Sequence, residues 1–191
     1  MLIILGLKWY PVIIAIIILL SCYYHTFRQL NRKFWQNITV YSCLVYLLVL
    51  CWLVFTPVGP QMPDSYKPLM YFHGVPYNLR PLQNIDPEFL ANIVMTIPLG
   101  CYVYCWQPRL KSWQLLLIAL IPGAIIESAQ FVSDLLVGNH RVADIDDVIT
   151  NTLGVLVGYG VFWLVSKTPG DRLLKYFRLW KIKPLICFVP N

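Results

Sequence analysis

Apolar runs close to the length of a bilayer constrain this chain more strongly than any other feature of its sequence. A membrane-spanning helix needs roughly 20 predominantly apolar residues. Runs of this kind occur at residues 9–24, 40–56, 89–106, 113–132 and 148–165. Because 58% of the 191 residues are hydrophobic and only 13% are charged, we predict an all-α, polytopic helical membrane protein. About five transmembrane helices leave no room for a soluble domain, so residues 1–191 are expected to form a single membrane domain.

Basic residues lie in alternate connections between these runs. Short cytoplasmic loops retain Lys and Arg, and this bias sets the orientation of a membrane protein. The first connection, the third connection and the tail hold Arg28, Arg32, Lys33, Arg109, Lys111, Lys167, Arg172, Lys175, Arg178, Lys181 and Lys183. We therefore expect the N-terminus outside and the C-terminus in the cytoplasm. The net charge of +6 is then a topological feature, and no nucleic-acid partner is expected.

The first apolar run could alternatively be a cleaved signal peptide. Residues 19–22 weakly resemble a lipoprotein cleavage site, but the basic cluster at residues 28–33 would then have to be translocated. The charge bias favours a retained helix. The cysteines show no paired metal-ligand spacing, so we expect them to be reduced and to need no metal or other cofactor.

Two segments outside the apolar runs, the longest loop and the tail, also carry apolar side chains. The outer loop at residues 57–86 contains six prolines, which restrict regular structure, and its aromatic residues favour packing on the helix ends. In the tail at residues 171–183, Leu173, Leu174, Phe177 and Trp180 share one helical face. This pattern is typical of an interfacial helix on anionic lipid, although a solvated tail is an open alternative.

A polar stripe runs along the fourth apolar run. Glu127, Gln130 and Asp134 follow one another at three and four residues and therefore share a helical face. An ionisable group in hydrocarbon costs several kcal/mol unless it is paired or hydrated, so Glu127 should face other helices. Such a residue can join helices, but a carboxylate is a costly choice for that purpose, which favours a functional role.

A second polar stripe opens the fifth run. Asp144, Asp147, Asn151, Gly154 and Gly158 recur at three or four residues. Gly154 and Gly158 form a GxxxG pattern, which is typical of helix packing and could join two copies in a homo-oligomer. Acidic residues at a helix start also complement the helix dipole, which explains Asp146 and Asp147 equally well.

The third run begins with Asn92 and Thr96, followed by Pro98 and Gly100. A proline with a nearby glycine bends a membrane helix or leaves a carbonyl free inside it. A simple kink is the favoured interpretation.

These motifs together resemble the VanZ-like membrane protein family. The order is an Asn followed by Pro-x-Gly at residues 92–100, E-x-x-Q at 127–130, and D-x-x-D-x-x-x-N-x-x-G at 144–154. Residues 78–82 also look like the family segment that precedes the Asn, with Leu82 where a Phe is common. The resemblance covers residues 78–158 and implies a multi-pass protein of the bacterial cytoplasmic membrane. The family is named for a member that gives low-level resistance to teicoplanin, a glycopeptide antibiotic, and the resemblance transfers no catalytic residue.

The expected topology brings the polar residues into the outer half of the membrane, where three spans could form one binding pocket. Its members would be Arg80, Asn92, Glu127, Gln130, Arg141, Asp144, Asp147 and Asn151. We expect this pocket to bind a membrane lipid, a lipid-linked cell-wall precursor or a glycopeptide drug, with the arginines contacting phosphate.

An intramembrane enzyme is the main alternative. Asp144, Asp147 and Glu127 could hold a divalent cation, with His140 as acid or base, to modify a lipid-linked envelope substrate. A transporter is the least favoured hypothesis, because the inner halves of these spans offer almost no polar path.

Overall fold

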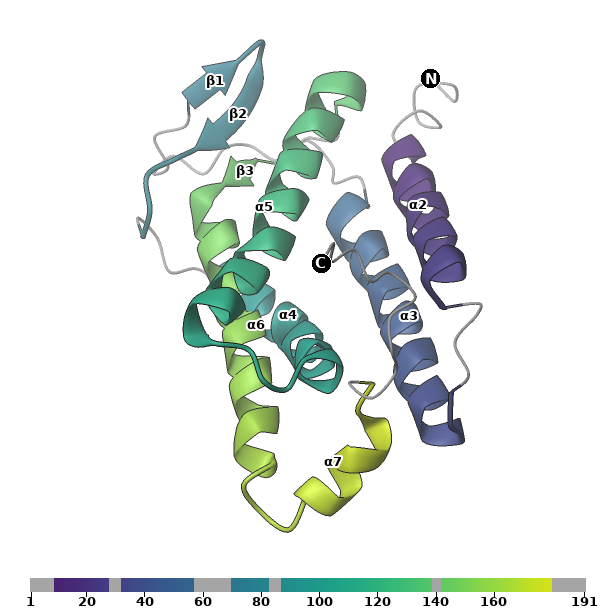
Figure 1. Cartoon of the computed structure of the whole chain (residues 1–191). Coiled ribbons are helices and arrows are strands. Elements are labelled where there is room, and N and C mark those ends of the chain that lie inside the picture. Colours follow the sequence, from purple (N-terminus) through teal and green to yellow (C-terminus); the bar gives the residue numbers. More distant parts are fainter. Residues whose placement is uncertain (1–8, 28–31, 57–69, 83–86, 139–141, 180–191) are drawn as a thin grey trace, which may run out of the picture.

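The computed structural model describes residues 9–27, 32–56, 70–82, 87–138 and 142–179, and its architecture is helical (Figure 1). The helices are α2 (Tyr10–Phe27), α3 (Phe34–Phe55), α4 (Pro87–Trp106), α5 (Ser112–Val137), α6 (Ile145–Val165) and α7 (Asp171–Phe177). The helices α3, α4, α5 and α6 are long and apolar enough to cross a membrane, whereas α2 is shorter. The prediction of an all-α, multi-pass membrane protein is confirmed; the count of five spans and the orientation remain predictions.

The helices α4 and α6 form the most extensive contact in the bundle because three glycines let their backbones meet. A Cβ atom on Gly154 would collide with the Thr96 hydroxyl and the Ile93 carbonyl, and one on Gly158 would collide with the Ile97 carbonyl. Gly100 is packed in the same way against the backbone of α6. Gly154 and Gly158 therefore both face α4 of their own chain, and a homo-oligomer formed through them stays a prediction.

Part of the outer loop is regular, contrary to the expectation from its prolines. Strands β1 (Met70–Phe72) and β2 (Val75–Asn78) form a hairpin, and β2 pairs in parallel with β3 (Ala143–Asp144). The two turn residues, His73 and Gly74, both have positive φ, at 48° and 83°. Paired positive φ values match the twist of a tight hairpin, so the turn overcomes the effect of the prolines. Residues 57–69 and 83–86 of this loop lie outside the described part.

The hairpin lies against α5 at one end of the bundle. Phe131 of α5 contacts the rings of Phe72 and Tyr77, with centroids 6.2 and 6.0 Å apart. Through the parallel pairing, Asn78 comes to stand beside Asp144. The small sheet thus connects the loop before α4 with the start of α6.

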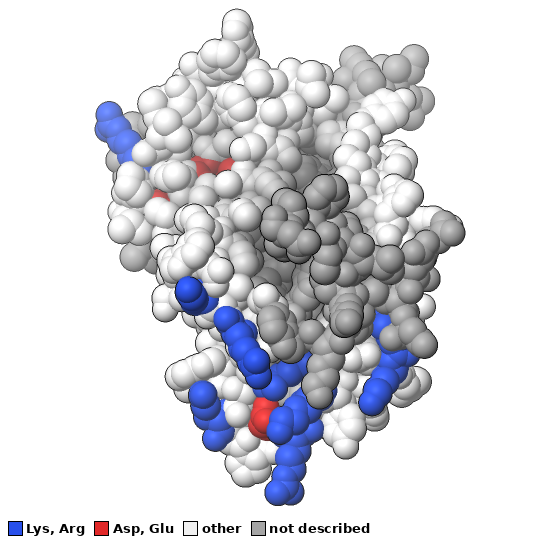
Figure 2. All heavy atoms as spheres, viewed as in Figure 1, with Lys and Arg blue, Asp and Glu red and all other residues white. Residues whose placement is uncertain are grey.

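Charge is distributed unequally between the two ends of the bundle (Figure 2). Lys and Arg gather around α7, whereas the acidic atoms visible near the opposite end are largely surrounded by uncharged residues. The basic end carries Lys33 at the start of α3, Lys111 before α5 and Lys167 after α6, all of them exposed. We refer to the two ends as the basic end and the acidic end.

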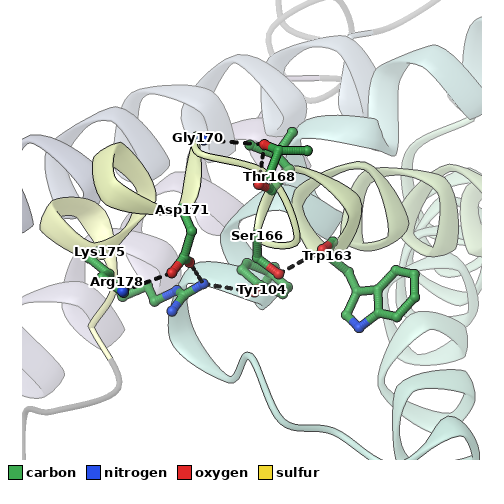
Figure 3. A network of polar contacts seen from close by, with 9 residues as sticks. Tyr104, Trp163, Ser166, Thr168, Gly170, Asp171, Lys175 and Arg178 are labelled. Carbon is green, nitrogen blue, oxygen red and sulfur yellow. Dashed lines mark hydrogen bonds and ion pairs between the residues drawn. The ribbon is translucent and has the colours of Figure 1, made fainter.

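The helix α7 is fixed to the basic end by polar contacts (Figure 3). Arg178 donates to an oxygen of Asp171 at 2.6 Å and to the Tyr104 hydroxyl at 2.9 Å, and Lys175 pairs with the other oxygen of Asp171 at 2.9 Å. The Thr39 hydroxyl of α3 donates to the Phe177 carbonyl at 2.9 Å. The predicted tail helix therefore exists but ends at Phe177, and residues 180–183 lie outside the described part.

Candidate functional site

Buried polar side chains gather at the acidic end, where β2, α4, α5 and the start of α6 meet. We call this group the polar cluster; its members are Asn78, Asn92, Glu127, Asp144, Asp146, Asp147 and Asn151. Except for Asn92 and Asp147, which are half-buried, all of them are buried. In a membrane protein such residues are costly, and each requires a partner or a function.

Asp144 lies at the centre of the polar cluster. The amide nitrogen of Asn78 donates to both carboxylate oxygens of Asp144, at 3.1 and 3.2 Å. One of these oxygens also accepts from the backbone N–H of Asp146 at 2.9 Å and thereby caps α6. The backbone N–H of Asp144 donates to Glu127 at 3.1 Å, which connects α5 to the start of α6. Asp144 is therefore held from three directions.

Asp146 fixes the loop that follows β2. Its carboxylate accepts from the backbone N–H of Leu82 at 2.6 Å, and Leu82 has a φ of 58°. A non-glycine residue in the left-handed region is strained, so the bond to Asp146 helps to hold it there. The helix-dipole interpretation of Asp146 is thus incomplete, because this side chain also positions the segment that carries Arg80.

Two contacts join α4 to α6 within the polar cluster. Asn92 donates to a carboxylate oxygen of Asp147 at 2.7 Å. One turn deeper, the Thr96 hydroxyl lies 3.0 Å from the backbone oxygen of Asn151. These contacts explain why polar residues recur every third or fourth position on both helices.

The side chain of Asn151 is almost completely buried, at 1% exposure. Its neighbour on α5 is Gly123, where an added Cβ would lie 3.4 Å from that of Asn151. Among the described residues, no donor lies within hydrogen-bond distance of its side-chain oxygen. A buried acceptor without a donor costs about 1–3 kcal/mol, so the side-chain oxygen of Asn151 is an acceptor left unused within the described residues.

Gln130 serves a different purpose from the rest of the predicted pocket. Its amide nitrogen donates to the carbonyl of Val54 at 3.0 Å, in the last turn of α3. Carbonyls at a helix C-terminus lack a partner within the helix, and in a bilayer they need one from elsewhere. Gln130 therefore joins α5 to α3, as the helix-joining interpretation of this stripe expects.

Of the two arginines predicted for the pocket, the structure describes only Arg80. Arg80 is exposed, and its backbone N–H donates to the side-chain oxygen of Asn78 at 2.9 Å, which ties it to the polar cluster. Arg141 and His140 lie outside the described residues.

The cation site of the enzyme hypothesis is not assembled. In the part of the chain that the structure describes, no group of three or more His, Cys, Asp or Glu side chains is arranged to hold a metal ion. Asp147 is bonded to Asn92, while Glu127 accepts the backbone N–H of Asp144. The described carboxylates are thus directed to protein donors.

Sequence reasoning missed Asn78 as a site residue. Asn78 has no measurable exposure and contacts Asp144 directly. Its signal was its place at the head of residues 78–82, the segment already noted for its resemblance to the family. Thr96 was noted but not placed in the pocket, although its hydroxyl reaches α6.

One comparison with known proteins is informative. A family model described as VanZ/LLP1 matches residues 43–166, which begin within α3 and end just after α6. The match therefore includes the whole polar cluster and extends beyond residues 78–158 on both sides. No curated protein and no solved structure matches the chain.

Proposed function

The chain belongs to the VanZ/LLP1 family, and on that premise we propose that it contributes to glycopeptide resistance of the teicoplanin type in the bacterial cell envelope. It does so by binding a lipid, a lipid-linked cell-wall precursor or the drug at the polar cluster. The protein acts in the cytoplasmic membrane, with the acidic end outward, because basic loops are retained inside.

The observation that carries this proposal is the burial of four carboxylates at one end of an apolar bundle. Each is at most 7% exposed, and they are Glu127, Asp134, Asp144 and Asp146. Buried ionisable groups in a membrane protein cost several kcal/mol and usually mark a functional site. Helix packing alone would be served at lower cost by the glycines that α4 and α6 already use.

The chemistry of the ligand follows from the hydrogen-bonding groups at the polar cluster. Arg80 is exposed beside the polar cluster, and its guanidinium can bind phosphate through two parallel hydrogen bonds. The buried oxygen of Asn151 can accept a hydrogen bond from a hydroxyl or amide. A phosphorylated lipid or lipid-linked precursor carries both kinds of group.

The test uses a bacterial strain that lacks its own copy of the gene and is complemented with variants. We expect Arg80→Gln and Glu127→Gln to lower teicoplanin tolerance to the level of the deletion strain. Glu88→Gln is the matched control, since Glu88 is an exposed carboxylate at the start of α4 and should keep full tolerance. Immunoblots of membranes check that all variants accumulate equally.

Two results would contradict the proposal. Full tolerance in both site variants would show that the polar cluster takes no part in resistance. A change in the chemical composition of envelope lipids that depends on Glu127 would instead indicate an enzyme. The expected result is unchanged lipid chemistry with an altered amount of cell-bound drug.

A further inference from the structure

An apolar groove lies at the basic end, opposite the polar cluster. It has a volume of about 450 Å³ and is bounded by α3, α4, α6 and α7. Its lining includes Ile38, Ile97, Pro98, Phe162, Leu173 and Phe177. The volume falls within the range of small-molecule pockets, about 300–1,000 Å³. We call this feature the α7 groove.

Three polar side chains that line the α7 groove, Thr39, Ser42 and Cys101, donate hydrogen bonds to backbone carbonyls of the protein. The Thr39 hydroxyl donates to the Phe177 carbonyl at 2.9 Å, and the Ser42 hydroxyl donates to the Thr39 carbonyl at 3.1 Å. The Cys101 thiol lies 3.5 Å from the Gly158 carbonyl. The surface left for an occupant is therefore hydrocarbon, which suits an acyl chain better than a polar ligand.

The helix α7 separates this hydrocarbon surface from water. Leu173, Leu174 and Phe177 line the groove, whereas Arg172 and Lys175 lie on the other side of the helix. Leu173 is 63% exposed although it is apolar, and Tyr176, an aromatic residue of the kind enriched at the membrane interface, is also exposed. This is the arrangement of an amphipathic helix in a membrane interface.

The charge around α7 is positive. Asp171 pairs with Lys175 and Arg178, Arg172 is a further basic residue of α7, and exposed Lys33 precedes α3 at the same end of the bundle. Figure 2 shows Lys and Arg side chains gathered around α7. Lys175 remains 65% exposed despite its contact with Asp171. Basic residues at the end of an apolar groove between helices favour an anionic headgroup.

We propose that the α7 groove binds one acyl chain of an anionic phospholipid from the leaflet around the basic end. The headgroup phosphate lies beside α7, where Arg172 and Lys175 supply positive charge on the side of the helix that faces away from the groove. Burial of hydrocarbon against Leu173 and Phe177 provides most of the affinity, and the basic residues select anionic over zwitterionic lipid. The site is independent of the polar cluster, so either proposal can fail without the other.

The test measures lipid retained by the full-length protein in mild detergent, using native mass spectrometry. The probes are phosphatidylglycerol and phosphatidylcholine with identical acyl chains. We expect one phosphatidylglycerol to be retained, with phosphatidylcholine bound roughly tenfold more weakly, since each basic residue near a headgroup contributes to affinity. Arg172→Gln with Lys175→Gln should remove this preference. The matched control is Lys111→Gln with Lys167→Gln at the same end, which should preserve it.

A second variant tests the groove itself. Leu173→Trp places a bulky indole ring at the groove and should reduce retention of phosphatidylglycerol at least fivefold. A loss of this size corresponds to about one apolar side-chain contact with the acyl chain. Leu164→Trp on α6 is the control, because Leu164 is equally exposed but does not line the groove. Circular dichroism and gel filtration check folding, and the charge variants decide the matter if Leu173→Trp does not fold.

Three outcomes would overturn the proposal. Equal retention of both lipids would show that the basic residues of α7 do not select the headgroup. Unchanged retention in Leu173→Trp would place the lipid elsewhere. Retention by a chain ending at Leu179, but not by the full chain, would show that residues 180–191 compete for the groove.

Discussion

The side-chain amide of Asn78 donates to both carboxylate oxygens of Asp144, although 66 residues separate the two in the sequence. Both residues are buried. This contact joins the end of β2 to Asp144, the N-cap residue of α6. Loss of the contact should therefore affect the whole acidic end.

Asn78→Ala should lower the free energy of unfolding by about 1–3 kcal/mol, because it leaves a buried carboxylate with fewer donors. Unfolding in mixed micelles, followed by circular dichroism, measures this loss. The neighbouring substitution Leu79→Ala is the control, since Leu79 is exposed and should be nearly neutral. Equal stability of the two variants would show that the Asn78–Asp144 contact contributes little.

Gly158→Ala should destabilise the protein by about 1–3 kcal/mol, as overpacking of a tight contact does. The added methyl group would collide with the Ile97 carbonyl, so α4 and α6 would have to separate. Gly160→Ala on the same helix meets no atom within 4 Å and should be neutral or stabilising by up to about 1 kcal/mol. The same unfolding assay distinguishes them, and similar losses for both would contradict the close contact.

Asn92 and Asp147 should show a coupling energy of about 0.6–1.7 kcal/mol in a double-mutant cycle with alanine, the range for polar contacts between membrane helices. Asp147→Ala alone should cost more than Asn92→Ala, because Asp147 takes part in further interactions. Additive effects of the two substitutions would show that the bond is not energetically significant.

The attachment of α7 should weaken in acid. The hydrogen bond from Lys175, supported by Arg178, holds the pKa of Asp171 below its ordinary value. A carboxyl with a lowered folded-state pKa stabilises the fold above its unfolded pKa and loses that contribution as the pH falls through the folded pKa. The difference in unfolding midpoint between the wild type and Asp171→Asn should therefore be constant near neutral pH and shrink below about pH 4. A difference independent of pH would exclude this role.

Apolar periodicity and length predicted the helices well, but their ends less well. Residues 113–132 became α5 from Ser112 to Val137, because Ser133 and Asp134 continue the helix although they are polar. Both side chains are buried against the protein. A hydropathy pattern ends where polar residues begin, whereas a helix can continue if neighbouring elements cover them. For the same reason α3 begins at Phe34, before the run at residues 40–56.

The site was partly predictable because helical spacing places residues on one face without information about the fold. Spacing grouped Glu127 with Gln130, yet only the structure shows Glu127 bonded to Asp144 and Gln130 bonded to α3. The prolines of residues 57–86 indicate irregular structure, whereas the hairpin depends on the positive φ values of His73 and Gly74, which only the structure shows. Without the hairpin, nothing in the spacing indicated that Asn78 lies beside Asp144.

The contacts of α6 also impose an order on biosynthesis. Asn78, Asn92, Thr96 and Glu127 each find a partner at or after residue 144. A ribosome releases the chain from the N-terminus, at about 5–20 residues per second, so these four side chains emerge before any of those partners exists. The acidic end can reach its final arrangement only when α6 arrives. Truncation within that helix would therefore remove the partners that Asn92 and Thr96 find on α6.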